Sequence, residues 1–309
     1  MRGRKEADVR QLLLALLGRS GDGPTFGALA LEWLAEVERV CVDNEARHVL
    51  HLLPLHRRRD GELTAGHVER AMAASGLGPS TQNMLRSTGK LIIAWAQANG
   101  RWVSPNPFAL VRRRRQPRRV YQTLTLCEVT RLLSVATGHW LHRIAVGVLL
   151  GLRPGELAAL RPSDVDLVRG SVWIHRSHER AQTKTGRERL VAIPRCARGF
   201  IETAIKEGGE RLFPSRLGGQ MGRNAKLSKT FRALLRAADI GREVRFYDLR
   251  HTSATLHREA GCDPLVIRLT LGHAARNLTD DLYTHISLES QARELSRLCI
   301  CLRCANIVL

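Results

Sequence analysis

A segment rich in proline and arginine, residues 104–119, divides the chain into two parts that must fold separately. Its first four residues, 104–107, hold two prolines, which end a preceding helix. An arginine run interrupted by Pro117 follows. A chain of 309 residues has room for about two domains at roughly 150 residues each. The sequence therefore predicts two domains joined by a basic linker at residues 111–122. The arginines of the linker are Arg112, Arg113, Arg114, Arg115, Arg118 and Arg119.

The part before the linker has helical spacing of its apolar residues. Phe26, Leu29, Ala30 and Trp33 recur at offsets of three, four and seven residues. Alternating strand patterns are absent from this stretch. We predict a short helix or extension over residues 1–24 and a bundle of about four helices over residues 25–110.

The part after the linker, residues 123–309, mixes helical and strand patterns. Helices are predicted over 125–137, 139–150 and 226–240, and again from residue 251 to the end, where residues 287–303 form a C-terminal helix. Residues 171–175 and 189–193 read as strands, with Val172 and Ile174 on one face of the first and Val191 and Ile193 on one face of the second. The fold class predicted for the whole chain is mainly α with a small antiparallel β-sheet.

The net charge of +20 favours a polyanionic partner, nucleic acid before an anionic membrane surface. No run of 18 apolar residues exists, so we expect no spanning helix and no membrane partner. Seven cysteines, an odd number, suit a reducing cytoplasm. Cys299, Cys301 and Cys304 form at best a weak zinc site, and we predict no metal there. The linker arginines are candidate contacts to DNA phosphates.

Three short segments place cations or histidines beside helix ends. Arg153 precedes Pro154, which suits the first turn of a helix. Tyr247, Arg250 and His251 share one face if they lie on one helix. Gly272 reads as the end of a helix begun at Pro264, which puts His273 on a loop, and Tyr283 follows ten residues later. Each signal is weak alone, but their order is specific.

In this order the segments resemble the phage integrase, or tyrosine recombinase, family. The matching motifs are the Gly-Leu-Arg-Pro-Gly-Glu-Leu box at 151–157, the Thr-Lys-Thr-Gly turn at 183–186, Arg-His at 250–251, Leu-Gly-His at 271–273 and Tyr-Thr-His at 283–285. The resemblance covers roughly residues 123–288, and residues 25–110 look like the helical core-binding domain that precedes the catalytic domain. The catalytic residues that it implies are Arg153, Lys184, Arg250, His273 and Tyr283.

The resemblance implies a site-specific DNA recombinase or integrase. Such an enzyme transfers a DNA phosphodiester onto a tyrosine and then onto another strand, so that neither a metal nor a cofactor is required. Arginines suit the phosphate because a planar guanidinium pairs with two oxygens at once. Glu156 would orient Arg153, and His251 would pack beside Arg250. The implied partners are double-stranded DNA and three further copies, a homo-tetramer on two DNA sites, with a partner recombinase possible. The implied location is the cytoplasm, on the nucleoid.

Tyr247 departs from the family pattern, which has histidine at that position. A phenol can donate a hydrogen bond to phosphate, but its pKa of about 10 makes it a poor proton shuttle at neutral pH. A catalytically weak or silent DNA-binding regulator therefore stays open as an alternative. A type IB topoisomerase-like enzyme stays open as well, because it shares the arginine, lysine and tyrosine chemistry. The target site, and the choice between integration of a mobile genetic element and dimer resolution, are not readable from the sequence.

Overall fold

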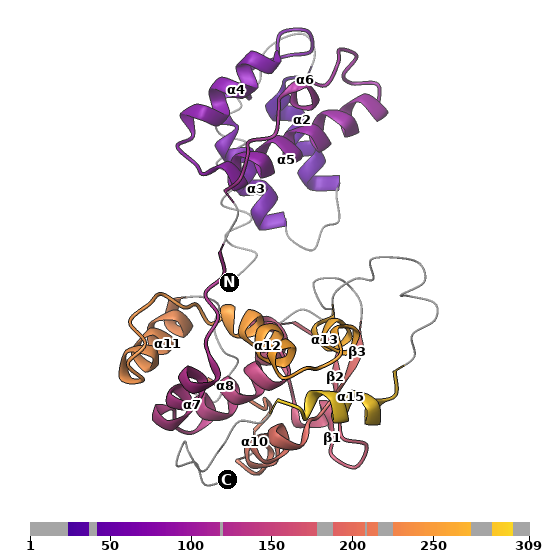
Figure 1. Cartoon of the computed structure of the whole chain (residues 1–309). Helices are drawn as coiled ribbons and strands as arrows, with labels where there is room; N and C mark the ends of the chain where they lie inside the picture. Colours follow the sequence, from indigo (N-terminus) through magenta and orange to yellow (C-terminus); the bar gives the residue numbers. More distant parts are fainter. Residues whose placement is uncertain are drawn as a thin grey trace. The chain divides into compact units, whose positions relative to one another are not determined.

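A computed structural model describes residues 24–36, 42–117, 120–177, 188–207, 209–215, 225–272 and 286–298. The chain separates into two compact units, Met1–Arg119 and Val120–Leu309 (Figure 1). Here they are called unit 1 and unit 2, and each is described by itself. Helices dominate both, and the only sheet in the described ranges belongs to unit 2. The predicted fold class is confirmed.

The regular elements described in unit 1 are all helices, and an isolated β-bridge joins Thr25 to Arg59. Its elements are α2 (Phe26–Glu36), α3 (Val42–His51), the 3-10 helix η1 (Leu53–Leu55), α4 (Ala65–Ala74), α5 (Pro79–Ala98) and α6 (Pro107–Leu110). The prolines begin helices where their missing N–H costs nothing: Pro79 opens α5 and Pro107 opens α6. Phe26, Trp33 and Phe108 are among its fully buried side chains.

Phe108 closes the core of unit 1 against a glycine of α5. A Cβ atom built on Gly89 would lie 2.2 Å from the Phe108 ring, so any larger residue at position 89 collides with it. The Asn106 side chain accepts a hydrogen bond from the Phe108 N–H at 3.1 Å, which caps α6. The Asn-Pro pair after α5 therefore directs the chain back onto this helix.

The segment after α6 is anchored on α5. Asn83 donates to the Arg114 carbonyl at 2.9 Å and accepts from the Arg114 N–H at 2.8 Å. Arg86 donates to the carbonyls of Val111 (2.6 Å) and Ala109 (3.1 Å). The first part of the predicted linker, up to Arg114, is thus held by unit 1.

Unit 2 packs helices on both sides of a small sheet and around a central helix. Its helices are α7 (Leu126–Val135), α8 (His139–Leu149), α9 (Pro154–Ala159), η2 (Pro162–Asp164), α10 (Arg195–Lys206), α11 (Ala225–Ala237), α12 (Asp248–Glu259), α13 (Pro264–Leu271) and α15 (Leu288–Leu295). The run 142–149 of α8 is buried on every side, because α10 and α12 pack against it. Such all-round burial marks α8 as the core helix of the unit.

The sheet has the order β1-β2-β3 and is antiparallel. Its strands are β1 (Val165–Asp166), β2 (Ser171–Ile174) and β3 (Arg189–Ala192). Val172 pairs with Val191 and both are buried, whereas the neighbouring pair, Trp173 and Leu190, is exposed. The predicted faces of the two longer strands are confirmed.

Some predicted helix bounds were wrong. Residues 195–206 were not predicted to be helical, yet α10 buries Ala197, Phe200, Ile201 and Ala204 at helical spacing. The helix carrying Arg250 begins at Asp248 and not at residue 251, because Asp248 starts the hydrogen-bonded turn. Residues 8–17 lie outside the described ranges. Residues 299–309 also lie outside these ranges. The described part of the predicted C-terminal helix, α15, packs on β3 and α13 of its own unit.

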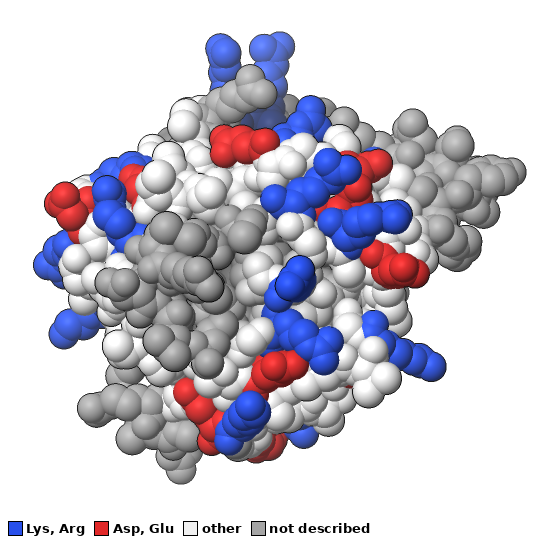
Figure 2. Space-filling model, turned by 60° about the horizontal axis from the view of Figure 1, so that its bottom comes forward, with Lys and Arg blue, Asp and Glu red and all other residues white. Residues whose placement is uncertain are grey.

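Positive and negative side chains lie side by side on the surface. On the face shown in Figure 2, Asp and Glu side chains directly adjoin Lys and Arg side chains. Pairs such as Arg198 with Glu202 (2.8 Å) and Arg297 with Glu294 (3.0 Å) are of this kind. Exposed ion pairs contribute only about 0–1 kcal/mol each. Their main effect is that a paired arginine offers less charge to a polyanion. No helix in the described ranges has both the length and the apolar composition to cross a bilayer.

Candidate active site

Arg153 sits at the start of α9, where Glu156 fixes it. The Arg153 N–H donates to Glu156 Oε2 at 2.9 Å, and its Nη1 donates to Glu156 Oε1 at 2.7 Å. A carboxylate on the third residue of a helix caps the free N–H before the first turn. Glu156 is only 1% exposed, so its carboxylate is removed from water, while the Arg153 side chain stays partly exposed.

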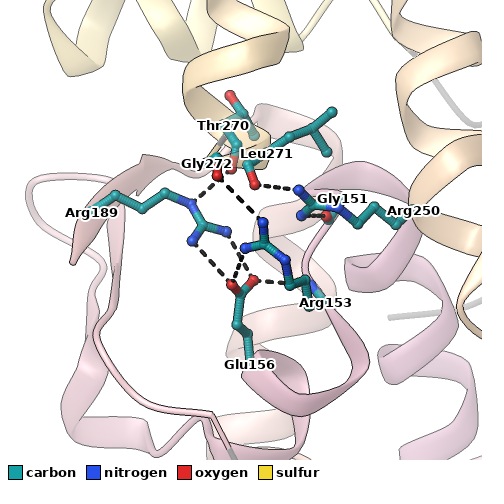
Figure 3. Close-up of polar contacts among 8 residues, drawn as sticks. All are labelled: Gly151, Arg153, Glu156, Arg189, Arg250, Thr270, Leu271 and Gly272. Carbon is teal, nitrogen blue, oxygen red and sulfur yellow. Dashed lines mark hydrogen bonds and ion pairs between the residues drawn. The ribbon is translucent and has the colours of Figure 1, made fainter. Parts of the chain in front are cut away.

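Arg250 reaches the same place from α12. The side chain is 4% exposed. Its Nη1 donates to the Gly151 carbonyl at 2.8 Å, and its Nη2 donates to the Leu271 carbonyl at 2.5 Å (Figure 3). Gly151 adopts a left-handed φ of 60°, and this turn presents its carbonyl to Arg250. Two arginines that are 97 residues apart in sequence (153 and 250) are thereby brought into one cluster.

A third arginine that the sequence analysis did not select joins this cluster. Arg189, the first residue of β3, donates from Nη2 to Glu156 Oε2 at 2.9 Å and from Nη1 to Glu156 Oε1 at 3.2 Å. One signal in the sequence could have identified it: residues 189, 191 and 193 alternate on one strand face, and the other two are buried apolar residues. A charged side chain on the strand face that points into the apolar core needs an oppositely charged or hydrogen-bonding partner.

The carboxyl end of α13 holds all three arginines. Its three successive carbonyls, those of Thr270, Leu271 and Gly272, accept from Arg189 (3.0 Å), Arg250 (2.5 Å) and Arg153 (3.3 Å), respectively. The last carbonyls of a helix lack partners within the helix and carry the negative end of its dipole. Gly272 ends α13 in the left-handed conformation, φ 65°, so the predicted helix end is confirmed.

Burial and neighbouring charges set the ionisation of the cluster. Burial opposes the charge of Glu156, but hydrogen bonds and charge from Arg189 and then Arg153 outweigh burial and lower its pKa. Burial, together with the charge of Arg153, lowers the pKa of Arg250 to about 10. Arg250 therefore keeps its proton at neutral pH. The cluster is a cationic site of guanidinium groups around one ionised carboxylate.

Tyr247 and His251 lie together at the start of α12. Their ring centroids are 5.7 Å apart, and the Tyr121 ring stacks on His251 at 3.8 Å. Tyr247 and Tyr121 are 44% and 47% exposed. His251 Nε2 is buried and has no hydrogen-bond partner among the described residues. The prediction that Tyr247, Arg250 and His251 share one helix face is confirmed for the Tyr247 and His251 rings. The Arg250 guanidinium instead points toward the end of α13.

Several predicted residues lie outside the described ranges. Among the predicted catalytic residues these are Lys184, His273 and Tyr283; among the linker arginines, Arg118 and Arg119; and among the cysteines, Cys299, Cys301 and Cys304. In the sequence, Lys184 lies between the strands β2 and β3, and His273 directly follows Gly272.

The remaining linker arginines belong to unit 1. Arg112, Arg113 and Arg115 are exposed, whereas Arg114 is partly buried and donates from Nε to Gln82 at 3.3 Å. Because the Arg114 backbone is fixed by Asn83, the exposed side chains project from an ordered segment. This arrangement suits contacts to a phosphate backbone.

Comparison with known proteins identifies relatives of the whole catalytic region. The model of the phage integrase family matches residues 122–289. Tyrosine recombinase XerC of Xanthomonas campestris pv. campestris (strain B100) is 28% identical over 227 residues, covering 71% of this chain and 67% of the relative. Tyrosine recombinase XerD of Ralstonia nicotianae is 31% identical over 225 residues, covering 68% of this chain and 70% of the relative.

Solved structures share the fold. A lambda integrase dimer bound to a COC′ core site has a TM-score of 0.68 at 18% identity, covering 85% of this chain and 98% of the solved chain. The Tn1549 transposon integrase in complex with transposon right end DNA has a TM-score of 0.67 at 18% identity, covering 89% of this chain and 99% of the solved chain. The family model covers more than half of the sequence, and the motifs at Arg153 and Arg250 fall within it. The chain therefore belongs to the phage integrase family.

Proposed function

We propose that this chain is a tyrosine-type site-specific DNA recombinase that cleaves and rejoins strands through a 3′-phosphotyrosyl intermediate, without metal or ATP. The observation that carries the proposal is the convergence of two guanidinium groups, that of partly buried Arg153 and that of buried Arg250, at the end of α13. The contacts made within the described ranges use two of the five side-chain N–H donors of each arginine. The other donors can bind the non-bridging oxygens of a phosphodiester.

This site suits phosphoryl transfer. The pentacoordinate phosphorus of the transition state carries one negative charge more than the diester, and fixed guanidinium groups stabilise that charge. Removing one preorganised donor of this kind typically lowers a rate by about 10²–10³-fold. Among the described residues, the proximity of Arg153 and Arg250 supports assigning this stabilisation to them.

The family motifs assign the bond-making steps. The Tyr283 hydroxyl oxygen forms a bond to phosphorus while the bond from phosphorus to the 5′ oxygen breaks. Lys184 gives its proton to that leaving oxygen, a role that arginine cannot take because it does not lose its proton. His273 contacts the phosphate and accepts the tyrosine proton, since its imidazole titrates near neutrality. The reverse sequence on a second strand restores the phosphodiester.

Tyr247 takes the place of the usual histidine as a hydrogen-bond donor to phosphate. Its phenol is exposed at the start of α12, three residues before Arg250. A neutral phenol donates one hydrogen bond and does not shuttle protons at neutral pH. Activity at a reduced rate follows from this substitution. His251 supports the Tyr247 ring from the next turn of the helix.

DNA would be bound by phosphate contacts from both units. The exposed arginines 112, 113 and 115 are the candidate contacts in unit 1. If about ten phosphates are neutralised, the affinity falls by about 10⁵-fold between 50 and 200 mM salt. A binding constant that stays flat across this range would refute binding through phosphate contacts from both units.

The proposed assembly is a homo-tetramer on two DNA sites. Its proposed location is the cytoplasm, on the nucleoid. A second, partner recombinase could replace some of the copies, and integration of a mobile element would use the same reaction. Two similarities support it: a lambda integrase tetramer bound to a Holliday junction shares the fold, with a TM-score of 0.67, and relatives are named both XerC and XerD. Sizing of the protein–DNA complex on one and on two sites measures the assembly.

The test of the function is a covalent adduct. The protein is incubated in EDTA with DNA flanking its own gene, and SDS-resistant protein–DNA adducts are compared with those of the Tyr283→Phe variant. We expect an adduct that the variant does not form. An adduct that persists in Tyr283→Phe would assign the nucleophile elsewhere, with Tyr247 next to be tested. Tight, specific binding without any adduct would indicate a DNA-binding regulator of the same fold.

A further inference from the structure

The contacts of Arg189 exceed what a structural ion pair requires. Its guanidinium uses all three nitrogens: Nη1 and Nη2 hold Glu156, and Nε holds the Thr270 carbonyl (Figure 3). One side chain thus ties together β3, α9 and the carboxyl end of α13. In the sequence, α9 directly follows Arg153, and α13 ends two residues before His273.

Glu156 is saturated by this arrangement. Its two oxygens accept four hydrogen bonds, two from Arg153 and two from Arg189. A carboxylate offers about four lone-pair positions, so its capacity is filled. Because Glu156 is 1% exposed, water cannot replace a lost partner cheaply.

The charges of the cluster give Arg189 a function. Arg153, Arg189 and Arg250 carry three positive charges and Glu156 one negative charge, a net charge of +2. Without Arg189 one positive charge is lost and the net charge falls to +1, and Glu156 then has Arg153 as its only ion-pair partner in the cluster. A phosphodiester carries one negative charge, and its pentacoordinate transition state carries two. The cluster with Arg189 matches the transition state better than the ground state, which is the condition for catalysis.

The backbone leaves space for this side chain. A Cβ atom at Gly272 would lie 2.9 Å from both Cζ and Nη1 of Arg189. The glycine that ends α13 therefore also lets Arg189 pass to Glu156. Arg189 and Arg153 then hold carbonyls on either side of Leu271, whose own carbonyl holds Arg250.

We propose that Arg189 is a positioning residue for strand cleavage: it offsets the buried charge of Glu156, so that Arg153 keeps its full charge and a fixed orientation for the scissile phosphate. This inference rests on the proposed function. Arg189 acts through Glu156 and Arg153, and it is not required to touch DNA.

The test uses the full chain and a duplex carrying the site that the wild-type protein cleaves. Adduct formation is measured at saturating DNA, and affinity is measured separately by gel shift. We expect Arg189→Gln to lower the adduct rate by about 10–100-fold, the size of effect seen when a residue that orients a functional group is removed. The affinity for DNA should change by less than about threefold, because the interaction is used in the transition state alone. Arg189→Lys, with the charge but not the three-point geometry, should recover part of the rate.

A charge suppressor separates this role from a merely structural one. Adding Glu156→Gln to Arg189→Gln removes the charge that is no longer offset, so the double variant should cleave at least about fivefold faster than Arg189→Gln, a coupling of the size seen for contacting residues. Damage to the fold would make the double variant as slow or slower. Arg242→Gln is the matched control, because Arg242 also makes a two-pronged pair with a carboxylate, Glu128, but touches no residue of the cluster. Its rate should equal that of the wild type.

The outcomes are distinct for the two proposals. No adduct from the wild-type protein would count against the proposed function, whatever Arg189 does. A wild-type rate in Arg189→Gln, or a double variant without recovery, would overturn the role of Arg189 and leave the function standing. The uncompensated charge of Glu156 should also be measurable without DNA: in urea unfolding at pH 7, Arg189→Gln should be less stable than the double variant. The opposite order would overturn it as well.

Discussion

Gly151 is the position where a single methyl group should do most harm to the site. It has a φ of 60°, and its carbonyl accepts from Arg250. A Cβ atom there would lie 2.4 Å from Leu271 Cδ2 and 2.9 Å from Ser253 Oγ. Leu271 and Ser253 are buried, so neither can move into open space. Gly151→Ala therefore combines a strained backbone with a clash.

The expected magnitude is the sum of these two effects. A left-handed conformation costs a residue with a Cβ atom about 1–2 kcal/mol. An added methyl group in a packed core costs about 1–3 kcal/mol more. We expect Gly151→Ala to lower the free energy of unfolding by about 2–5 kcal/mol. The clash also displaces Leu271, whose carbonyl is the second acceptor of Arg250, and the adduct rate should fall by about 10²-fold or more.

Gly170→Ala is the matched control. Gly170 has nearly the same φ, 64°, but nothing lies within 4 Å of a Cβ atom built there. Urea unfolding followed by circular dichroism should give a loss of only about 1–2 kcal/mol for this variant, the backbone cost alone. If Gly151→Ala were no less stable than Gly170→Ala, the close packing of Leu271 against the turn would be refuted.

Three further predictions concern stability. Burial lowers the pKa of His257, so the folded state resists its protonation, and the free energy of unfolding should fall as the pH drops below about 6.5. In His257→Gln the urea midpoint should depend less on pH between pH 7.5 and 5.5. An unchanged pH dependence would contradict this. Asn83→Ala removes both hydrogen bonds to the Arg114 backbone and should lower the stability of this contact by about 1–3 kcal/mol. Trypsin should then cleave faster at the neighbouring arginines than in the wild type, and equal cleavage rates would contradict the prediction. Gly89→Ala places a Cβ atom 2.2 Å from the Phe108 ring and should cost about 1–3 kcal/mol in thermal unfolding, part of which Phe108→Leu should restore.

Local signals in the sequence predicted the elements well. Pro154 at the first turn of α9 and Gly272 at the end of α13 are placed as expected. Proline fixes φ at a helical value and glycine accepts the left-handed conformation, and neither effect depends on distant contacts. The alternation of Val172 and Ile174 predicted a strand face correctly. Helix α10 carries the same kind of signal, with apolar residues at offsets of three, four and seven, and could have been found.

The site was predictable only where its residues belong to motifs. Arg153 and Arg250 carried short-range signals, and the structure brings them to one place. The contact of Arg189 with Glu156 spans 33 residues of sequence, and no local pattern specifies which carboxylate a strand arginine will meet. The hydrogen bonds to the end of α13 are also invisible in sequence, since they use main-chain carbonyls that every residue possesses.

The three carbonyls at the end of α13 have a consequence for how the protein meets its substrate. Long arginine side chains ordinarily lose rotamer freedom when they bind an anion, at a cost of about 0.5–1.5 kcal/mol for each side chain immobilised. Here Thr270, Leu271 and Gly272 hold the guanidinium groups through hydrogen bonds within the protein itself. The ordering entropy is therefore lost during folding and not at the encounter. The arginine site is preorganised, so most of its interaction energy remains available for the reacting phosphate.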